Sequence, residues 1–199
     1  PKARQPIPLS PYDDLRVEFH VEENLHEGKI RRIESEKGEK LPEWATPVFV
    51  VDQDAKGLLG RLVCAYGLVN SAMELPTFPS ADPQRAFDMA AGKRHHTVVD
   101  AIWGYNQFLL DESTRKLLVI CTRSGLYEWL RMPFGPAPAP AEMQSYVASR
   151  FGTLRNKRGE EFCSPCMDDI KISSDTFEDH IDEVNRLNAE AHKDGFEFK

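Results

Sequence analysis

Residues 166–172 read Cys-Met-Asp-Asp-Ile-Lys-Ile, and the architecture of the chain can be worked out from this segment. Two adjacent acids, Asp168 and Asp169, open an Ile-x-Ile strand within a predicted strand–turn–strand over 162–174. Ionised side chains are disfavoured inside a sheet, and neighbouring like charges repel unless a cation neutralises them. A hairpin tip that presents both acids to one point therefore predicts a site for a divalent metal, and oxygen ligands favour Mg²⁺. The alternative is a solvated turn, where Asp is a favoured residue.

A third acid, Asp100, ends an apolar strand that begins at Thr97. A lone carboxylate in such a strand either caps the next element or belongs to a site. If this strand lies beside the 162–174 hairpin, Asp100 converges with Asp168 and Asp169. Three carboxylates could hold two metal ions about 3.5–4 Å apart. One ion would activate an attacking hydroxyl, and the other would stabilise the leaving oxygen of a phosphoryl transfer.

The hydrophobic periodicity along the chain predicts short strands mixed with amphipathic helices. Strands are expected over 47–51, 61–66, 97–99, 106–110, 117–122, 125–130 and 162–174, with another beginning at Phe196. Helices are expected over 83–91, 141–151 and 178–194. The mixed order of these elements is typical of the α+β class with a mostly antiparallel sheet.

The composition is that of a globular protein, with 41% hydrophobic and 29% charged residues among 199, enough for one large domain or two small lobes. The net charge of −7 argues against a nucleic-acid partner, because phosphate contacts supply most of the affinity of such proteins. Three basic clusters oppose that argument, although each could equally be a solvated face. They contain Lys29, Arg31 and Arg32; Lys93, Arg94, His95 and His96; and Arg155, Lys157 and Arg158.

The four cysteines do not form a metal-binding pattern. Cys163 and Cys166 have a suitable spacing, but no second close pair of Cys or His completes a zinc site. Unpatterned cysteines are typical of a reducing compartment, so we expect an intracellular, cytoplasmic or nuclear protein rather than a secreted one. The sequence starts without Met, so it is expected to be part of a longer protein.

Five motifs in one order resemble the reverse transcriptases of gypsy-type LTR retrotransposons and, more distantly, of retroviruses. The resemblance covers roughly residues 17–199. The motifs are Thr46-Pro-Val-Phe49 with Arg61 and Asn70; Val99-Asp100 with Gly104-Tyr105-Asn-Gln107; Tyr127 to Gly135 with Ala139, Pro140 and Gln144; Cys166-Met-Asp-Asp169; and the helix 178–194 with Gly195.

This resemblance implies an α+β fold with the fingers and palm of a right-hand polymerase. A ferredoxin-like antiparallel palm sheet would be backed by the helices 83–91, 141–151 and 178–194. The implied segments are an extended N-terminal arm at 1–16, fingers at 17–80, palm at 81–110, strands of fingers and palm at 111–132, and palm again at 133–199. The thumb, connection and RNase H regions of the family have no counterpart in this sequence.

The implied activity is RNA-directed DNA synthesis, in which a primer 3′-hydroxyl attacks a dNTP with the help of two Mg²⁺ ions, or Mn²⁺ in their place. Asp100, Asp168 and Asp169 would be the catalytic acids and metal ligands, together with the backbone carbonyl of Ala101. The implied partners are an RNA or DNA template with a DNA primer, dNTPs and the remainder of a polyprotein, with no membrane. The implied location is a cytoplasmic virus-like particle or the nucleus.

The resemblance also assigns binding roles. Arg61 would reach the triphosphate, and Tyr105 would be a steric gate that excludes a ribose 2′-hydroxyl, unless it is a core aromatic. Phe134 and Gly135 would line the nucleotide pocket, and Met167 would lie against the primer end. The basic residues expected to contact nucleic acid are Lys29, Arg31, Arg32, Arg155, Lys157 and Arg158.

Several positions depart from the family pattern. Acidic or neutral Asp52 and Gln53 stand where the family carries lysines, and acids there would repel a triphosphate. Ala65 and Gly67 replace an expected charged pair, and the segment Pro136–Pro140 is rich in proline and lacks an expected Asn. Two hypotheses therefore stay open: a polymerase fragment, weak or inactive in isolation, and a catalytically decayed remnant that binds nucleic acid or protein. An unrelated α+β domain with accidental motifs is a third, weaker alternative.

Overall fold

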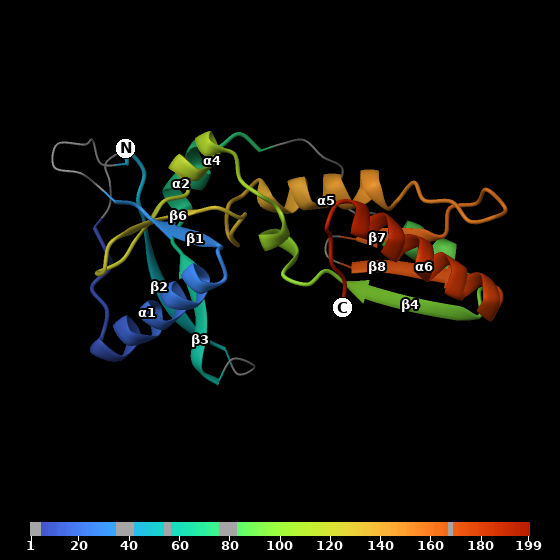
Figure 1. Ribbon diagram of the computed structural model, residues 1–199, viewed down its shortest axis with the longest axis horizontal. Helices are drawn as coiled ribbons and strands as arrows, with labels where there is room; N and C mark the ends of the chain where they lie inside the picture. The colour runs from blue at the N-terminus through green and yellow to red at the C-terminus, as the bar shows by residue number, and fades with distance from the viewer. Residues whose placement is uncertain (1–4, 35–41, 54–56, 76–82, 167–168) are drawn as a thin grey trace. The chain divides into compact units, whose positions relative to one another are not determined.

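The computed structural model describes residues 5–34, 42–53, 57–75, 83–166 and 169–199. The chain forms two compact units, each built from two separate stretches of sequence (Figure 1). Unit 1 contains Pro1–Glu74 and Phe108–Ala137, and unit 2 contains Leu75–Gln107 and Pro138–Lys199. Among the helices of the described ranges, none has both the length and the apolar character to cross a membrane.

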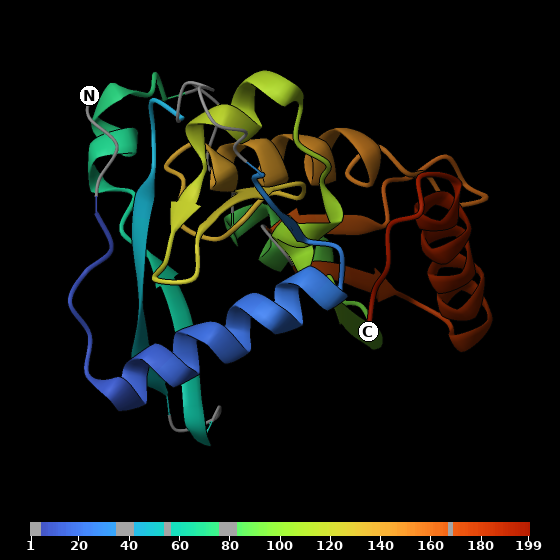
Figure 2. The same ribbon diagram turned by 60° about the vertical axis from the view of Figure 1, so that its left-hand side comes forward.

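Unit 1 is built on a five-stranded mixed sheet with the order β1-β6-β5-β2-β3. Its strands are β1 (Ile30–Arg32), β2 (Thr46–Gln53), β3 (Gly57–Cys64), β5 (Ile120–Cys121) and β6 (Leu126–Trp129). Its helices are α1 (Pro11–His26), α2 (Gly67–Ala72) and α4 (Glu112–Leu117). β2 and β3 confirm the strands predicted over 47–51 and 61–66, and they lie side by side as an antiparallel pair (Figure 2). Among the described strands of this sheet, only β2 and β5 pair in parallel.

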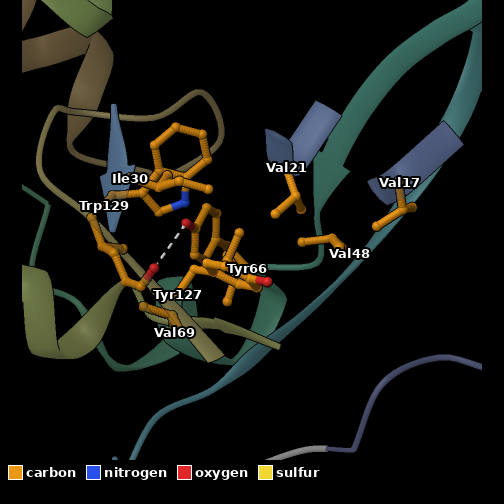
Figure 3. Close-up of a cluster of buried hydrophobic side chains, with 10 residues drawn as sticks. Val17, Val21, Ile30, Val48, Tyr66, Val69, Tyr127 and Trp129 are labelled. Carbon is orange, nitrogen blue, oxygen red and sulfur yellow. Dashed lines mark hydrogen bonds between the residues drawn. The ribbon is translucent and has the colours of Figure 1, made fainter. Parts of the chain in front are cut away.

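The core of unit 1 joins residues that are far apart in the sequence (Figure 3). Apolar side chains of α1 and of the strands surround the ring of Tyr66, which is only 2% exposed. The Tyr66 hydroxyl donates a hydrogen bond of 3.3 Å to the carbonyl of Leu118. The cluster comprises Val17, Val21, Ile30, Val48, Tyr66, Val69, Leu118, Ile120, Tyr127 and Trp129.

The predicted extended arm over 1–16 is wrong in its last part, because helix α1 begins at Pro11. The Ser10 hydroxyl accepts a hydrogen bond of 3.1 Å from the backbone N–H of Asp13, as an N-cap does. Pro11 stands in the first turn, where its missing N–H costs nothing. Proline here starts a helix rather than preventing one.

Unit 2 contains a three-stranded antiparallel sheet with the order β4-β8-β7. Its strands are β4 (His95–Asp100), β7 (Cys163–Cys166) and β8 (Asp169–Ser174). Its helices are α3 (Pro83–Ala90), α5 (Ala139–Arg150) and α6 (Phe177–Lys193), with a 3₁₀ turn, η2, over Gly104–Gln107. The three predicted helices are confirmed, with ends that differ from the predictions by at most two residues.

The two faces of this sheet differ. Ile170 and Ile172 are fully buried, and Thr97, opposite Ile172, contacts His180 of α6, so α6 covers their face. Lys171 lies on the other face, and its ammonium group stands 5.8 Å from the ring centroid of Phe87 on α3. Because side chains alternate along a strand, Asp169 shares the face of Lys171 rather than the face under α6.

The prediction for 106–122 was partly wrong. The strand expected over 106–110 is replaced by η2, with only an isolated bridge between Leu109 and Arg131. Helix α4 occupies most of the stretch between the two expected strands, because the Asp111 carboxylate caps it by accepting hydrogen bonds from the N–H groups of Ser113 and Thr114. Hydrogen bonds from the hydroxyls of Ser113 and Thr114, with a smaller contribution from these N–H groups, hold the pKa of Asp111 well below its usual range. Of the strand expected over 117–122, only β5 remains.

A buried polar network fastens α6 to the sheet of unit 2. The Ser174 hydroxyl donates to the Glu183 carboxylate, so its oxygen accepts from Nδ1–H of His180 at 2.7 Å. The unprotonated Nε2 of His180 then accepts a hydrogen bond of 2.7 Å from the Thr97 hydroxyl. Asn156 donates to the other Glu183 oxygen at 3.1 Å. The network therefore specifies a neutral His180 with its proton on Nδ1.

We expect the stability of unit 2 to fall as the pH drops below about 6.5, the pKa of an unperturbed His. Burial lowers the pKa of His180; Glu183 opposes that shift, and His95 and His96 add to it. At such pH the unfolded chain binds a proton at His180 more readily than the folded chain does. The free energy of unfolding therefore rises with pH in this range, by at most about 1.4 kcal/mol per pH unit. Urea denaturation between pH 5 and 8 measures this slope. A His180→Gln variant that kept the full slope would assign it to other groups.

Candidate active site

Two of the three predicted acids are brought together by strand register. Asp100 of β4 and Asp169 of β8 are direct cross-strand partners. Residues opposite each other in an antiparallel pair project to the same face, with Cβ atoms about 4.5–5.5 Å apart. Both carboxylates therefore lie on the face of Lys171, away from α6. The side chain of Asp100 is 38% exposed and Asp169 is exposed, so a ligand can reach them.

The third predicted acid, Asp168, and the predicted primer contact, Met167, lie outside the described residues. They occupy the two positions between Cys166 and Asp169, which are paired across β7 and β8. Within the described ranges no group of three or more His, Cys, Asp or Glu side chains is arranged to hold a metal ion. The described part of the site is thus a pair of carboxylates.

A cation already stands beside this pair. The ammonium group of Lys199 lies 2.5 Å from Oδ2 of Asp100. Its pKa is raised, mainly by the hydrogen bond to Asp100 and by the charge of that carboxylate, with a smaller contribution from Asp169. The backbone N–H of Lys199 also donates to the carbonyl of Asp100 at 3.0 Å. Mg²⁺ requires oxygen ligands, and the carboxylates of Asp100 and Asp169 are ligands of this type.

The segment after Asp100 is held in place by contacts with Glu197 and Phe198. Ala101, predicted to offer its carbonyl to a metal, is 6% exposed and forms an isolated antiparallel bridge with Phe198. Gln107 donates to the carbonyls of Ile102 and Glu197 at 2.6 and 2.9 Å and accepts from the N–H of Glu197 at 2.8 Å. These bonds tie the loop after β4 to the segment that follows α6.

Tyr105, the predicted steric gate, lies in η2 of unit 2 and is partly buried. The preceding turn places Trp103 in the left-handed region, at φ 53°, which is uncommon for a residue other than Gly. The N–H of Asn106 closes this turn on the carbonyl of Trp103 at 2.7 Å. The position of Tyr105 therefore depends on a constrained turn, five residues after Asp100.

Three predicted nucleotide contacts belong to unit 1. Arg61 of β3 lies opposite Val51, and its guanidinium carbon is 4.9 Å from the centroid of the Phe134 ring. Phe134 is 44% exposed, so this cation–π pair is open to solvent. Gly135 follows with a φ of 108°, and a Cβ there would lie 3.2 Å from Cδ2 of Tyr66. The structure thus gives a reason for glycine at this position.

The acid at position 52, where the family carries basic residues, has an internal partner. Its carboxylate accepts a 2.7 Å bond from Arg16 of α1, whose side chain is 8% exposed. Arg16 also donates to the carbonyl of Leu59 at 3.3 Å and to Asp13 at 3.0 Å. Gly60 is required beside it, because its φ is 61° and a Cβ at that position would lie 2.5 Å from the backbone carbonyl oxygen of Val51. The pair neutralises Asp52 and holds α1 to the β2–β3 hairpin, a contact that the sequence did not predict.

The predicted nucleic-acid-binding cations have partners within their own units. In unit 1, Lys29 pairs with Glu27 at 2.5 Å, Arg31 pairs with its cross-strand partner Glu128, and Arg32 donates to the carbonyl of Ser124 at 2.9 Å. In unit 2, Arg155 pairs with Glu161 at 3.1 Å, Lys157 with Asp182 at 2.9 Å and Arg158 with Asp179 at 2.7 Å. At each of these positions except Arg32, whose partner is a carbonyl, binding of nucleic acid would replace a carboxylate partner by phosphate.

Comparison with known proteins identifies the class. The family model described as "Reverse transcriptase (RNA-dependent DNA polymerase)" matches residues 39–199. The chain is 32% identical over 182 residues to the "Retrovirus-related Pol polyprotein from transposon 297" of Drosophila melanogaster, covering 89% of this chain and 16% of that protein. It is 29% identical over 179 residues to the "Enzymatic polyprotein" of Cauliflower mosaic virus (strain D/H), covering 89% of this chain and 25% of that protein.

Solved structures show the same fold. The crystal structure of the Prototype Foamy Virus protease–reverse transcriptase matches with a TM-score of 0.74 at 20% identity, over 100% of this chain and 25% of that one. The fold is therefore that of the fingers and palm of a right-hand polymerase. The chain belongs to the reverse transcriptase (RNA-dependent DNA polymerase) family, in the form of a domain of retroelement polyproteins. It spans between about a sixth and a quarter of the length of these relatives.

Proposed function

We propose that this chain carries the fingers and palm of an RNA-directed DNA polymerase and contributes its catalytic acids. The observation that carries the proposal is the cross-strand pairing of Asp100 with Asp169 on the accessible face of the unit 2 sheet. Family membership supports it. The proposed substrates are a DNA primer on an RNA or DNA template and dNTPs, and the remainder of a polyprotein, including a thumb and an RNase H domain, is the proposed partner.

The proposed metal site consists of Asp100, Asp168, Asp169 and the carbonyl of Ala101. The contact of the Lys199 ammonium with Asp100 supports it, because it is an interaction of a cation with a carboxylate of the proposed site. Two Mg²⁺ ions, or Mn²⁺ ions, would supply charge neutralisation for the attacking 3′-hydroxyl and the departing pyrophosphate. The acids fix where this positive charge is placed, and Lys199 has to give up its contact with Asp100 when a metal binds.

The other proposed roles concern the nucleotide. Arg61 binds triphosphate oxygens, since a guanidinium forms paired hydrogen bonds with phosphate. Phe134 holds that guanidinium by a cation–π contact, and Gly135 leaves room beside it. Met167 contacts the primer end. Basic residues of both units contribute to nucleic-acid binding once phosphate replaces their present partners, which are acidic except for the carbonyl bonded to Arg32. These residues are Lys29, Arg31, Arg32, Arg155, Lys157 and Arg158.

The experiment that tests the proposal is primer extension on an RNA template with Mg²⁺ or Mn²⁺. Metal-dependent incorporation of dNTPs by this chain, or by a longer chain that includes it, is the expected result. The second candidate function is a decayed remnant that binds nucleic acid without catalysis, favoured by Asp52 and by the prolines of the 133–140 segment. Binding of primer and template without extension, in the longer chain as well, would support the remnant and contradict the polymerase.

We expect Tyr105→Ala to weaken the discrimination between dNTPs and rNTPs. Removing the ring opens space for a ribose 2′-hydroxyl, and one lost steric contact of this kind changes a ratio of kcat/KM by roughly 10–200-fold. The measurement is kcat/KM for dATP and ATP on the same primer. Trp103→Ala, in the same turn, is the control for general distortion. An unchanged ratio in Tyr105→Ala would assign the ring to the core instead.

A further inference from the structure

The side chain of Asn70 binds the backbone of the segment 133–137 with both ends of its carboxamide. Its Nδ2 donates to the carbonyl of Gly135 at 3.0 Å, and its Oδ1 accepts from the N–H of Ala137 at 2.9 Å. Asn can form both bonds because it carries a donor and an acceptor on one planar group. The opposite nature of the two partners also fixes which end of the amide points to which residue.

The segment that Asn70 holds has few backbone donors of its own. Pro133 and Pro136 lack an N–H, so they cannot form backbone hydrogen bonds as donors. Gly135 lies against the buried ring of Tyr66, where its φ of 108° and the 3.2 Å approach of a hypothetical Cβ both favour Gly. The segment is therefore seated on Tyr66 from one side and bonded to Asn70 at two points.

This segment carries Phe134, whose ring meets the guanidinium of Arg61 at 4.9 Å. A shift of the Gly135 backbone moves its chain neighbour Phe134 and thus the surface on which Arg61 rests. We infer that Asn70 is a positioning residue for the nucleotide pocket: it fixes the 133–137 backbone, and thereby the Arg61–Phe134 pair, for a nucleoside triphosphate. The inference rests on the proposed polymerase function for its ligand, while the contacts of Asn70 stand without it.

The first test is hydrogen exchange of the Ala137 amide, which needs no activity. Asn70→Ala removes both bonds, whereas Asn70→Asp keeps an acceptor for Ala137 and loses the donor to Gly135. We expect the Ala137 amide to exchange about tenfold faster or more in Asn70→Ala, as the loss of one hydrogen bond predicts, and less so in Asn70→Asp. Ser71→Ala is the matched control, because within the described residues the Ser71 hydroxyl bonds to the carbonyl of Leu68 in α2. Equal exchange in the wild type and Asn70→Ala would overturn the inference.

The second test separates KM from kcat in primer extension. Since Arg61 and Phe134 bind rather than react, we expect KM for the dNTP to rise about tenfold in both Asn70 variants, with kcat within about twofold of the wild type. Ser71→Ala should leave both constants unchanged, and thermal melting verifies that each variant folds. A lowered kcat at constant KM, or no change in either constant, would contradict the positioning role. If the wild type itself extends no primer, the proposed function fails and the nucleotide role fails with it, while Ala137 exchange still decides whether Asn70 holds the segment.

Discussion

Asp100→Asn is expected to abolish metal-dependent primer extension, with a loss of about 10³-fold or more. The substitution keeps the size of the side chain but removes one negative charge from the pair that Asp100 forms with Asp169. Metal ions contribute several kcal/mol of charge stabilisation in such reactions, and each 1.4 kcal/mol corresponds to a factor of ten in rate. The measurement is single-nucleotide incorporation with saturating dNTP and Mg²⁺. The same result is expected for Asp168→Asn.

A second readout separates metal binding from catalysis. Mn²⁺ binding, followed by electron paramagnetic resonance, should weaken in Asp100→Asn even without primer or nucleotide. Asp88→Asn is the matched control, because Asp88 is an exposed acid of the same unit whose carboxylate accepts a hydrogen bond from Gln84 on the same helix. Wild-type activity in Asp100→Asn would remove the metal assignment, and an equal loss in Asp88→Asn would show that the effect is not specific to the site.

Phe151→Ala is expected to have the largest effect on stability, at about 3–5 kcal/mol. Phe151 is fully buried, and its ring lies 5.5–6.0 Å from the rings of Tyr146, Phe196 and Phe198. Its carbonyl also accepts a hydrogen bond from the Cys163 thiol at 2.9 Å, and burial raises the pKa of that thiol to about 12. Truncation leaves a cavity that these neighbours fill only in part. Urea denaturation followed by circular dichroism measures the change.

The control for this prediction is Phe177→Ala in the same unit. Phe177 is 59% exposed and makes an edge contact with His95, so its truncation should cost about 1 kcal/mol or less. Similar losses in the two variants would mean that the aromatic cluster around Phe151 does not carry the stability of unit 2. The Phe151 variant should also loosen the segment from Phe196 to Lys199, which bonds to β4 and its loop.

Local chemistry was enough to predict most of the elements of unit 2. Pro83 and the glycines at 92 and 195 mark the limits of α3 and α6, and the pattern of 162–174 predicted the β7–β8 hairpin. The start of α1 was missed although its signal is local: Ser10 followed by Pro11 is a capping sequence, but four prolines in sixteen residues favoured an extended arm. The capping role of Asp111 was also missed, because the apolar runs on either side of it favoured two strands joined by a turn.

The 133–140 segment lacks an expected Asn, and the structure shows that this change affects the start of helix α5. Pro138 is the N-cap of α5 and forms no side-chain capping bond. A capping Asn contributes about 1 kcal/mol at such a position. Pro140 fits the first turn of α5, so it does not break the helix.

The sequence predicted Asp100, Asp168 and Asp169 as the acids of the candidate site, from their places at the ends of apolar strands and from the family resemblance. That Asp100 and Asp169 project to one face did not follow, since a shift of β4 by one residue would turn Asp100 to the opposite face at no cost visible in the pattern. The turn at Trp103 is likewise held by bonds between Gln107 and Glu197, ninety positions apart. Short-range preferences thus gave the elements and the chemical groups, whereas register and long-range hydrogen bonds decided which of those groups meet.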